Sequence, residues 1–304
     1  MLILRSHARA NTTAKALRDA ARDAENVRSG RDNGPDTILH AYRRWASTCL
    51  MQLCQYIADD EYDRMITSHR YWTLQTIDPT TWERGPFQQY VDYELRERAE
   101  VMKREAELLE AEWERWNGSG SGIDSQYLPP HWLDAVVLDT NVLLTHHAEL
   151  SSRDWHTDLR LESPAPLGLA IPLRVVRELD RKKMANNNDV NRGTRNELRK
   201  DAGNALRFIE DAIGDPGNRK TIRRQTADGD VITPELNLLL IADRVPGVPI
   251  NDPDAEIVDR ALSLQPFARK VHLLSYDAGI IFRARQEGLH AVKLLYSNMN
   301  DSAP

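Results

Sequence analysis

The sequence predicts an α/β protein with a central parallel sheet, preceded by an all-α domain. Three observations support this prediction. After residue 130, short continuous apolar runs alternate with helical patterns, which is typical of a parallel sheet covered by helices. Residues 1–117 show helical patterns only. A flexible Gly/Ser/Pro segment, 118–130, separates the two parts. We therefore expect a helical domain over 1–117, a linker over 118–130 and an α/β domain over 131–304.

Composition sets broad limits on function. The 304 residues are 41% hydrophobic and 28% charged, with 40 Lys+Arg against 46 Asp+Glu and a formal net charge of −6. This balance excludes a basic coat over the whole chain but leaves room for a local basic face. No run of 18 apolar residues is present, so we expect no membrane association. The start of the chain, Met1 to Arg5, has no signal-peptide core, and we therefore expect a cytoplasmic protein.

The first half is predicted to contain several helices. Residues 12–28 are rich in alanine and straight side chains, which favour helix. In 36–57 apolar residues recur every three or four positions, and shorter helical segments follow over 59–74.

The longest helical segment is expected over residues 86–116. Its apolar stripe is interrupted by Arg98 and Glu105. Two interpretations are open: a helix packed on its neighbours, or an arm that pairs with a second subunit. We therefore expect residues 1–117 to serve in substrate selection, in binding a protein partner or in forming a homodimer.

The second half alternates predicted strands with predicted helices. The strands are 135–138, 168–171, 271–274 and 291–295, and helices are expected over 173–184 and around 280–286. Residues 238–241 fit either a strand or a buried helical turn, and 245–253 fit a loop.

Acidic residues follow several of these strands. Asp139 and Asp277 come directly before helices, Asp252 and Asp254 stand at another helix start, and Glu178 lies beside the apolar face of its helix. Each alone fits a helix cap or a dipole interaction. Together they are better explained by convergence, because adjacent parallel strands end side by side. Converging carboxylates repel unless a cation lies between them, and oxygen ligands favour Mg²⁺ or Mn²⁺ over zinc.

Two histidines, His146 and His147, follow the first acidic motif. We interpret both as surface residues of that helix rather than as metal ligands.

Four segments carry a resemblance to the PIN-domain ribonuclease family: 136–144 (VVLDTNVLL), 171–180 (IPLRVVRELD), 251–257 (NDPDAEI) and 273–277 (LLSYD). In this resemblance Asp139, Glu178 and Asp277 fall on the first, second and fourth acids of the family. Asp254, three residues before Ile257, matches the third acid better than Asp252 does. Asn141 and Ser275 match positions where the family places a small polar residue near the metal.

The resemblance implies a Rossmann-like α/β/α sandwich that hydrolyses RNA phosphodiester bonds with Mg²⁺ or Mn²⁺. It implies that Asp139, Asp254 and Asp277 hold the metal directly or through water, while Glu178 orients the water or a second cation. The expected substrate is RNA, single-stranded in preference to duplex.

RNA binding needs positive charge near such an acidic pocket. Residues 174–207 contain ten basic and five acidic residues. The candidates for RNA contacts are Arg177, Arg181, Lys182, Arg192, Arg195 and Arg199. An ordinary solvated helix face explains the same residues equally well.

Two other functions fit the sequence. One is a structure-specific DNA nuclease of related fold, although such enzymes usually carry more acidic ligands. The other is a non-catalytic RNA-binding or assembly protein. The retained acids argue against the latter, because an unused cluster of carboxylates only destabilises a fold.

Overall fold

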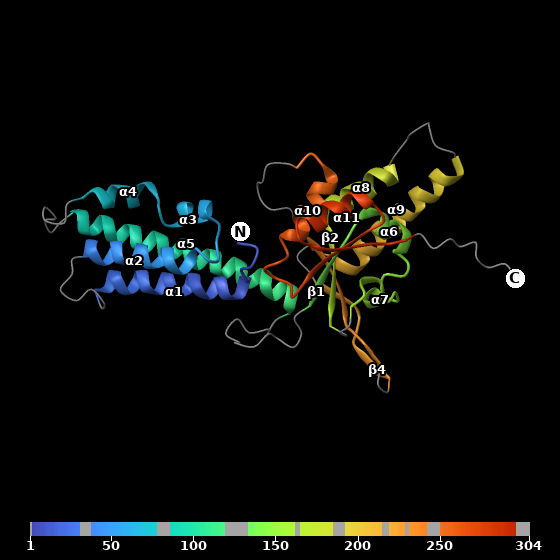
Figure 1. Cartoon of the computed structure of the whole chain (residues 1–304), viewed down its shortest axis with the longest axis horizontal. Coiled ribbons are helices and arrows are strands. Elements are labelled where there is room, and N and C mark those ends of the chain that lie inside the picture. Colours follow the sequence, from blue (N-terminus) through green and yellow to red (C-terminus); the bar gives the residue numbers. More distant parts are fainter. Residues whose placement is uncertain are drawn as a thin grey trace. The chain divides into compact units, whose positions relative to one another are not determined.

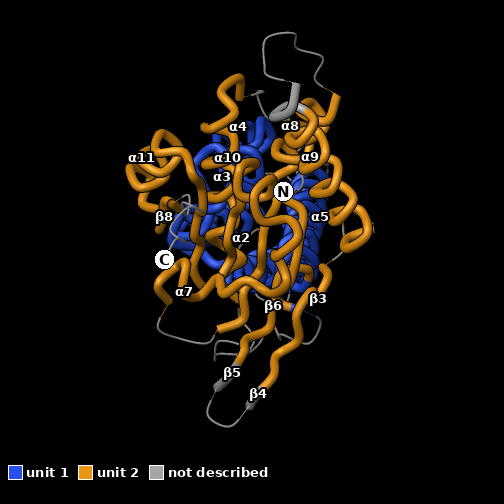
Figure 2. The backbone as a smooth tube through the Cα atoms, turned by 90° about the vertical axis from the view of Figure 1, so that its right-hand side faces the viewer, with its two compact units in different colours: residues 1–114, 118–127 blue, residues 115–117, 128–304 orange. Residues whose placement is uncertain are grey.

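A computed structural model gives the structure of the chain. It describes residues 2–30, 38–77, 86–118, 133–161, 165–184, 192–214, 219–228, 231–241 and 250–295. The chain forms two compact units, one of residues 1–114 with 118–127 and the other of 115–117 with 128–304 (Figure 2). The predicted linker lies outside the described residues except for Gly118.

The first unit is helical, as predicted. Its elements are α1 (Ala10–Ser29), α2 (Ile38–Leu53), α3 (Asp59–Met65), α4 (His69–Thr76) and the main part of α5 (Pro86–Asn117) (Figure 1). The buried face of α1 is largely alanine, which lets α2 approach closely, and Trp45 Nε1 of α2 donates to Ala20 O at 3.0 Å. Gly30 ends α1 with φ at 70°, a left-handed conformation that suits glycine.

Polar residues on the inner face of α5 have partners within the first unit. Glu94 is fully buried and accepts a 2.8 Å hydrogen bond from Ser68 Oγ. Arg98 donates to Met65 O at 3.0 Å, and Glu105 lies 3.2 Å from Arg64 Nη2. These contacts favour the interpretation of α5 as a helix packed on its neighbours, because Arg98 and Glu105, which interrupt its stripe, bond α3, and Glu94 bonds the residue that caps α4.

The second unit is an α/β domain built on a six-stranded sheet (Figure 1). Its strands are β1 (Asp134–Leu138), β2 (Leu167–Pro172), β3 (Arg219–Arg223), β6 (Leu236–Ile241), β7 (Val271–Ser275) and β8 (His290–Lys293). Two further strands, β4 (Thr226–Asp228) and β5 (Val231–Thr233), form a separate antiparallel pair. The helices are α6 (Thr140–His146), α7 (Trp155–Leu159), α8 (Leu173–Met184), α9 (Arg192–Ile213), α10 (Pro253–Leu262) and α11 (Ala278–Gln286).

The predicted strands are all present, and β6 settles the alternatives for residues 238–241 in favour of a strand. β3 was not predicted. It is a polar edge strand that runs antiparallel to β6, with a register shift between Thr221 and Arg223. In the predicted loop 245–253, residues up to 249 lie outside the described part of the chain.

The sheet order is β3-β6-β2-β1-β7-β8, and all pairs except β3–β6 are parallel. From β1 the chain adds β2, then the edge strand β3 and, between β3 and β2, β6, before it returns to add β7 and β8 on the other side. The order therefore reverses between β1 and β7, where Leu138 pairs with Leu274. Parallel sheets bind ligands at the carboxyl ends of the strands beside such a reversal.

Candidate active site

Asp139 directly follows β1 at the reversal point of the sheet. Its side chain caps α6, where Oδ1 accepts a 2.6 Å hydrogen bond from Thr140 N. Oδ2 accepts a 2.8 Å bond from Ser275 Oγ, at the end of β7. Asp139 is only 4% exposed. Its two hydrogen bonds fix its carboxylate between the start of α6 and the end of the neighbouring strand β7.

Asp277 lies two residues after the end of β7. Its side chain caps α11 by accepting a 2.6 Å hydrogen bond from Gly279 N. A Cβ atom at Gly279 would lie 3.2 Å from that carboxylate oxygen, so glycine permits the close approach. The backbone N–H of Asp277 donates to Ser275 Oγ at 2.9 Å. The buried Ser275 therefore links both acids.

Glu178 reaches the same end of the sheet from α8. Thr140 Oγ1 donates to its Oε2 at 2.6 Å, and Arg174 Nε donates to its Oε1 at 3.1 Å. Arg174 also lies 3.7 Å from the carboxylate of Glu256, a buried residue of α10. Thr140, Arg174 and Glu256 were not predicted as neighbours of the site. The spacing of four between Arg174 and Glu178 was a usable signal for one of these contacts.

The structure separates the roles of the two acids at the start of α10. Asp252 is the helix cap, since its Oδ1 accepts from Asp254 N at 3.0 Å and from Ala255 N at 3.4 Å. Arg283 Nη1 donates to its other oxygen at 2.5 Å and, as the main cause, lowers the pKa of Asp252. The Asp254 carboxylate accepts no hydrogen bond from a described residue. Burial raises its pKa most, and the negative charge of Asp277 raises it further.

The acids influence one another electrostatically. Burial raises the pKa of Asp139, and the carboxylates of Glu178 and Asp254 add to that rise. The pKa of Asp254 is raised in turn by Asp277 and Glu178. Each of the four side chains therefore lies in the negative field of at least one of the others, which is the expected result of convergence at one end of the sheet.

The chemistry of these donors fits Mg²⁺ or Mn²⁺, because all four are carboxylates and like charges at close range favour a cation. Their present rotamers are set by protein partners instead: Asp139 turns to Ser275 and Thr140, and Glu178 turns to Arg174. Within the described residues, no three acidic, His or Cys side chains converge tightly enough to enclose one ion. Direct ligation by three of them requires side-chain rotation.

The interpretation of His146 as a surface residue was wrong. His146 is 8% exposed, its Nε2 lies 2.6 Å from Tyr276 Oη, and Arg153 Nη1 lies 2.9 Å from its Nδ1. Because arginine only donates, Nδ1 accepts and Nε2 carries the proton. Burial and Arg153 lower the pKa of His146. Both ring nitrogens of His146 therefore have protein partners, which connect α6 to Tyr276 after β7 and to Arg153. His147 is half-buried, and its Nδ1 lies 3.2 Å from Leu144 O.

The remaining predicted residues lie near α8, α6 and α9. Arg177 and Arg181 are exposed on α8, Lys182 is half-buried, and the exposed Arg199 donates to Lys183 O at 3.1 Å. The side chains of Arg192 and Arg195 lie outside the described part. Asn141, in the first turn of α6, lines a pocket of about 440 Å³ together with Leu144, Thr145, His147, Leu198 and Asp201.

A family model described as "PIN domain" matches residues 136–295, which is more than half of the chain. The chain belongs to the PIN-domain family. PIN domains are typically metal-dependent nucleases, and all five predicted acids fall within the matched residues of this PIN domain. A search of curated proteins finds no match to the chain. No described helix has the length and apolar character that crossing a membrane requires.

Proposed function

We propose that this PIN-domain protein is an endoribonuclease that uses Mg²⁺ or Mn²⁺. One observation supports the proposal: besides burial, the charges of Glu178 and Asp254 raise the pKa of Asp139, and those of Asp277 and Glu178 raise the pKa of Asp254. A metal held by Asp139, Asp254 and Asp277 would neutralise this charge, lower the pKa of a bound water and stabilise charge developing on phosphate.

The protein's own residues support this chemistry in distinct ways. Ser275 and the N–H of Thr140 hold the Asp139 carboxylate at the end of β1, where it would bind a metal through water or, after side-chain rotation, directly. Glu178, held by Thr140 Oγ1 on one oxygen and Arg174 on the other, is placed to accept a proton from an attacking water or to orient it. Asp252 supports the site as the cap of the helix that carries Asp254.

We propose that α8 and α9 supply the RNA contacts. Arg181 and Lys182 lie three and four positions after Glu178, so on a helix they continue its face by one turn. Arg177 and Arg199 add exposed positive charge, and Arg192 and Arg195 belong to the same proposed surface by sequence. Such phosphate contacts give affinity that depends on salt and not on base sequence.

The decisive experiment is cleavage of end-labelled RNA and of DNA with the same sequence, each single-stranded, with Mg²⁺, Mn²⁺ or EDTA. The wild type is compared with Asp139→Asn, Asp277→Asn and a control, Asp211→Asn, which removes an exposed acid near the end of α9. We expect RNA cleavage only with metal, lost in the first two variants and kept in the control. Cleavage that persists in EDTA contradicts a metal-dependent mechanism, and cleavage of DNA alone would establish the DNA nuclease instead. Binding without cleavage by pure wild type with metal would favour the RNA-binding protein.

We propose that the first unit binds a protein partner or a second copy of the chain. Large aromatic side chains stand exposed on α4 and α5: Trp72 is 60% exposed, and Tyr90 and Tyr93 are 43% and 47% exposed. Exposed aromatic residues are enriched at interfaces. Light scattering of the full chain and of Trp72→Ala distinguishes the two: a dimer that dissociates in the variant identifies a second copy, whereas a monomer directs the search to a partner.

A further inference from the structure

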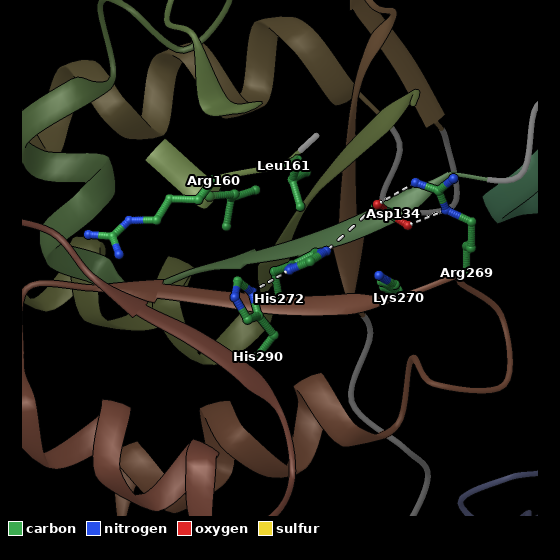
Figure 3. Close-up of a pocket in the computed structure, with 8 residues that line it drawn as sticks. Asp134, Arg160, Leu161, Arg269, Lys270, His272 and His290 are labelled. Carbon is green, nitrogen blue, oxygen red and sulfur yellow. Dashed lines mark hydrogen bonds and ion pairs between the residues drawn. The ribbon is translucent and has the colours of Figure 1, made fainter. Parts of the chain in front are cut away.

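A second pocket lies at the opposite end of the sheet from the acids. It has a volume of about 690 Å³ and lies at the start of β1, β7 and β8 (Figure 3). Its lining residues are Asp134, Leu159, Arg160, Leu161, Arg269, Lys270, His272 and His290. Since β1 has five residues at about 3.3 Å each, this pocket lies roughly 16 Å from the end of the sheet that carries Asp139.

We infer that this pocket binds a phosphate monoester of about the size of a nucleotide. The inference does not depend on cleavage of RNA, because none of the lining residues belongs to the candidate active site.

The charge of the pocket favours an anion. Asp134 is the single carboxylate among its described lining residues, and it is already matched by Arg269, whose Nε and Nη2 donate to it at 2.8 and 2.7 Å. Burial works against the charged form of Asp134, but Arg269 and His272 outweigh it and lower the pKa to about 2. Arg160 and Lys270 are both exposed, and neither forms an ion pair with a described residue. Among the described lining residues, about two positive charges are therefore not neutralised by a carboxylate.

Two histidines that line the pocket, His272 and His290, contact each other, and His272 also lies next to Asp134 of the Asp134–Arg269 ion pair. His272 is 2% exposed, and its Nδ1 lies 2.8 Å from His290 Nδ1. Its Nε2 has no hydrogen bond and lies 3.7 Å from Asp134 Oδ2. Figure 3 shows the His272 ring between His290 and Asp134.

The proton positions follow from these contacts. A proton on His272 Nε2 faces the Asp134 carboxylate, whereas a lone pair there would be repelled by it. His272 Nδ1 then accepts from His290 Nδ1–H, and His290 Nε2 keeps a lone pair. The exposed His290 therefore offers an acceptor beside cationic side chains. A phosphate monoester matches the cationic side chains of the pocket, because its second pKa is near 6 and it carries about −1.5 to −2 charges at pH 7. The fraction that keeps a proton can donate it to His290 Nε2.

The size and the apolar wall of the pocket indicate that more than the phosphate binds. Inorganic phosphate would leave most of about 690 Å³ unfilled, whereas pockets of this size hold small organic ligands. Leu159 and Leu161 line it together with the charged residues. A nucleoside 5′-phosphate supplies both an apolar ring and the charged group. The source is either a free nucleotide or the phosphorylated end of an RNA strand.

Calorimetric titration of the full chain with adenosine 5′-monophosphate tests the inference. EDTA is included so that no metal ion links phosphate to the acids of the other site. We expect one molecule to bind per chain, with adenosine and the diester 3′,5′-cyclic AMP at least about tenfold weaker. Absence of binding, or equal binding of adenosine, would overturn the inference.

Charge variants locate the site. Lys270→Gln and Arg160→Gln each remove a positive charge at an exposed position and are expected to weaken binding about tenfold. Lys15→Gln, an exposed lysine on α1, is the matched control and should leave affinity unchanged. Affinity that is unchanged in both pocket variants would place the ligand elsewhere and contradict the inference.

The source is distinguished with short RNA. A tetranucleotide with a 5′-phosphate that binds as well as adenosine 5′-monophosphate, while its 5′-hydroxyl form does not, identifies a strand end. Failure of the phosphorylated tetranucleotide beside tight binding of the mononucleotide identifies a free nucleotide. Either result supports a phosphate monoester site.

Discussion

Ser275 Oγ donates a hydrogen bond to Asp139 Oδ2 at 2.8 Å, and Ser275 Oγ also accepts a hydrogen bond from the backbone N–H of Asp277 at 2.9 Å. One hydroxyl group thus connects the acid that follows β1 with the acid that follows β7. Ser275 is fully buried, so water cannot replace it without rearrangement of the strand ends.

Replacing this serine should weaken metal binding. In Ser275→Ala the pKa of Asp139 rises further, because the hydroxyl now stabilises the charged carboxylate. We expect the affinity for Mn²⁺ at pH 7 to fall about tenfold, as measured by calorimetry. Ser263→Ala, which removes a hydroxyl bonded to Arg260 O at the end of α10, serves as the control. Equal affinity in both variants would mean that Ser275 does not position a ligand.

The two acids at the start of α10 should differ in kind. Asp254→Asn is expected to reduce cleavage at least about 100-fold, because it removes a proposed metal ligand. Asp252→Asn keeps an acceptor for the helix N–H groups and should change cleavage less than about threefold, and loss of the exposed ion pair with Arg283 should change stability little. Rates under single-turnover conditions and urea unfolding measure the two effects. If Asp252→Asn lost more activity than Asp254→Asn, Asp252 would be the metal ligand and Asp254 would not.

Without metal, the charged Asp139 carboxylate should lower the stability of the folded chain, and this loss should depend on pH. The pKa of Asp139 in the folded chain is raised above its ordinary value of 3.8. Between pH 3.8 and this raised pKa, the folded state therefore binds more protons than the unfolded state. Stability therefore falls as pH rises through the window, and the loss is complete above the raised pKa. In EDTA at pH 7, Asp139→Asn should melt at a higher temperature than wild type, and the difference should vanish below pH 3.8.

Saturating Mn²⁺ should reverse this order, because the ion stabilises only the chain that keeps the carboxylate. A variant that is less stable than wild type in EDTA at pH 7 would show that the hydrogen bonds of Asp139 outweigh the repulsion.

Arg174 should contribute mainly to stability through two carboxylates. Arg174→Met leaves Glu178 and the buried Glu256 without this cation, and we expect a loss of about 2 kcal/mol in urea unfolding. The double variant Arg174→Met with Glu256→Gln should recover part of that loss, since the uncompensated charge is gone. Additive losses would show that the two side chains do not interact.

The sequence allowed the fold and the candidate acids to be predicted because both depend on local order along the chain. Asp139 and Asp277 each follow a continuous apolar run and begin a helix, and parallel strands bring such ends together. Glu178 was recognised by its place beside an apolar face, which its half-buried position on α8 matches.

Other features depend on contacts between distant segments. Arg174 reaches Glu256 across 82 positions of sequence, a pairing that helical periodicity does not encode. His146 was misplaced although it follows Val142 by four and Leu143 by three, which puts it on the buried face of α6. That prediction gave more weight to the polarity of histidine than to its place on the apolar face of the helix. Hydrogen bonds with Tyr276 and Arg153 make burial of the His146 ring favourable.

The polar strand β3 also determines how the sheet ends. An open strand edge is a template on which further chains can add, and proteins protect it with charge and with breaks in register. β3 has both: Arg219, Lys220 and Arg223 lie along it, and its pairing with β6 shifts between Thr221 and Arg223. We therefore expect the chain to resist strand-to-strand aggregation at this edge, and replacement of Lys220 by an apolar β-branched residue should lower its solubility at high concentration.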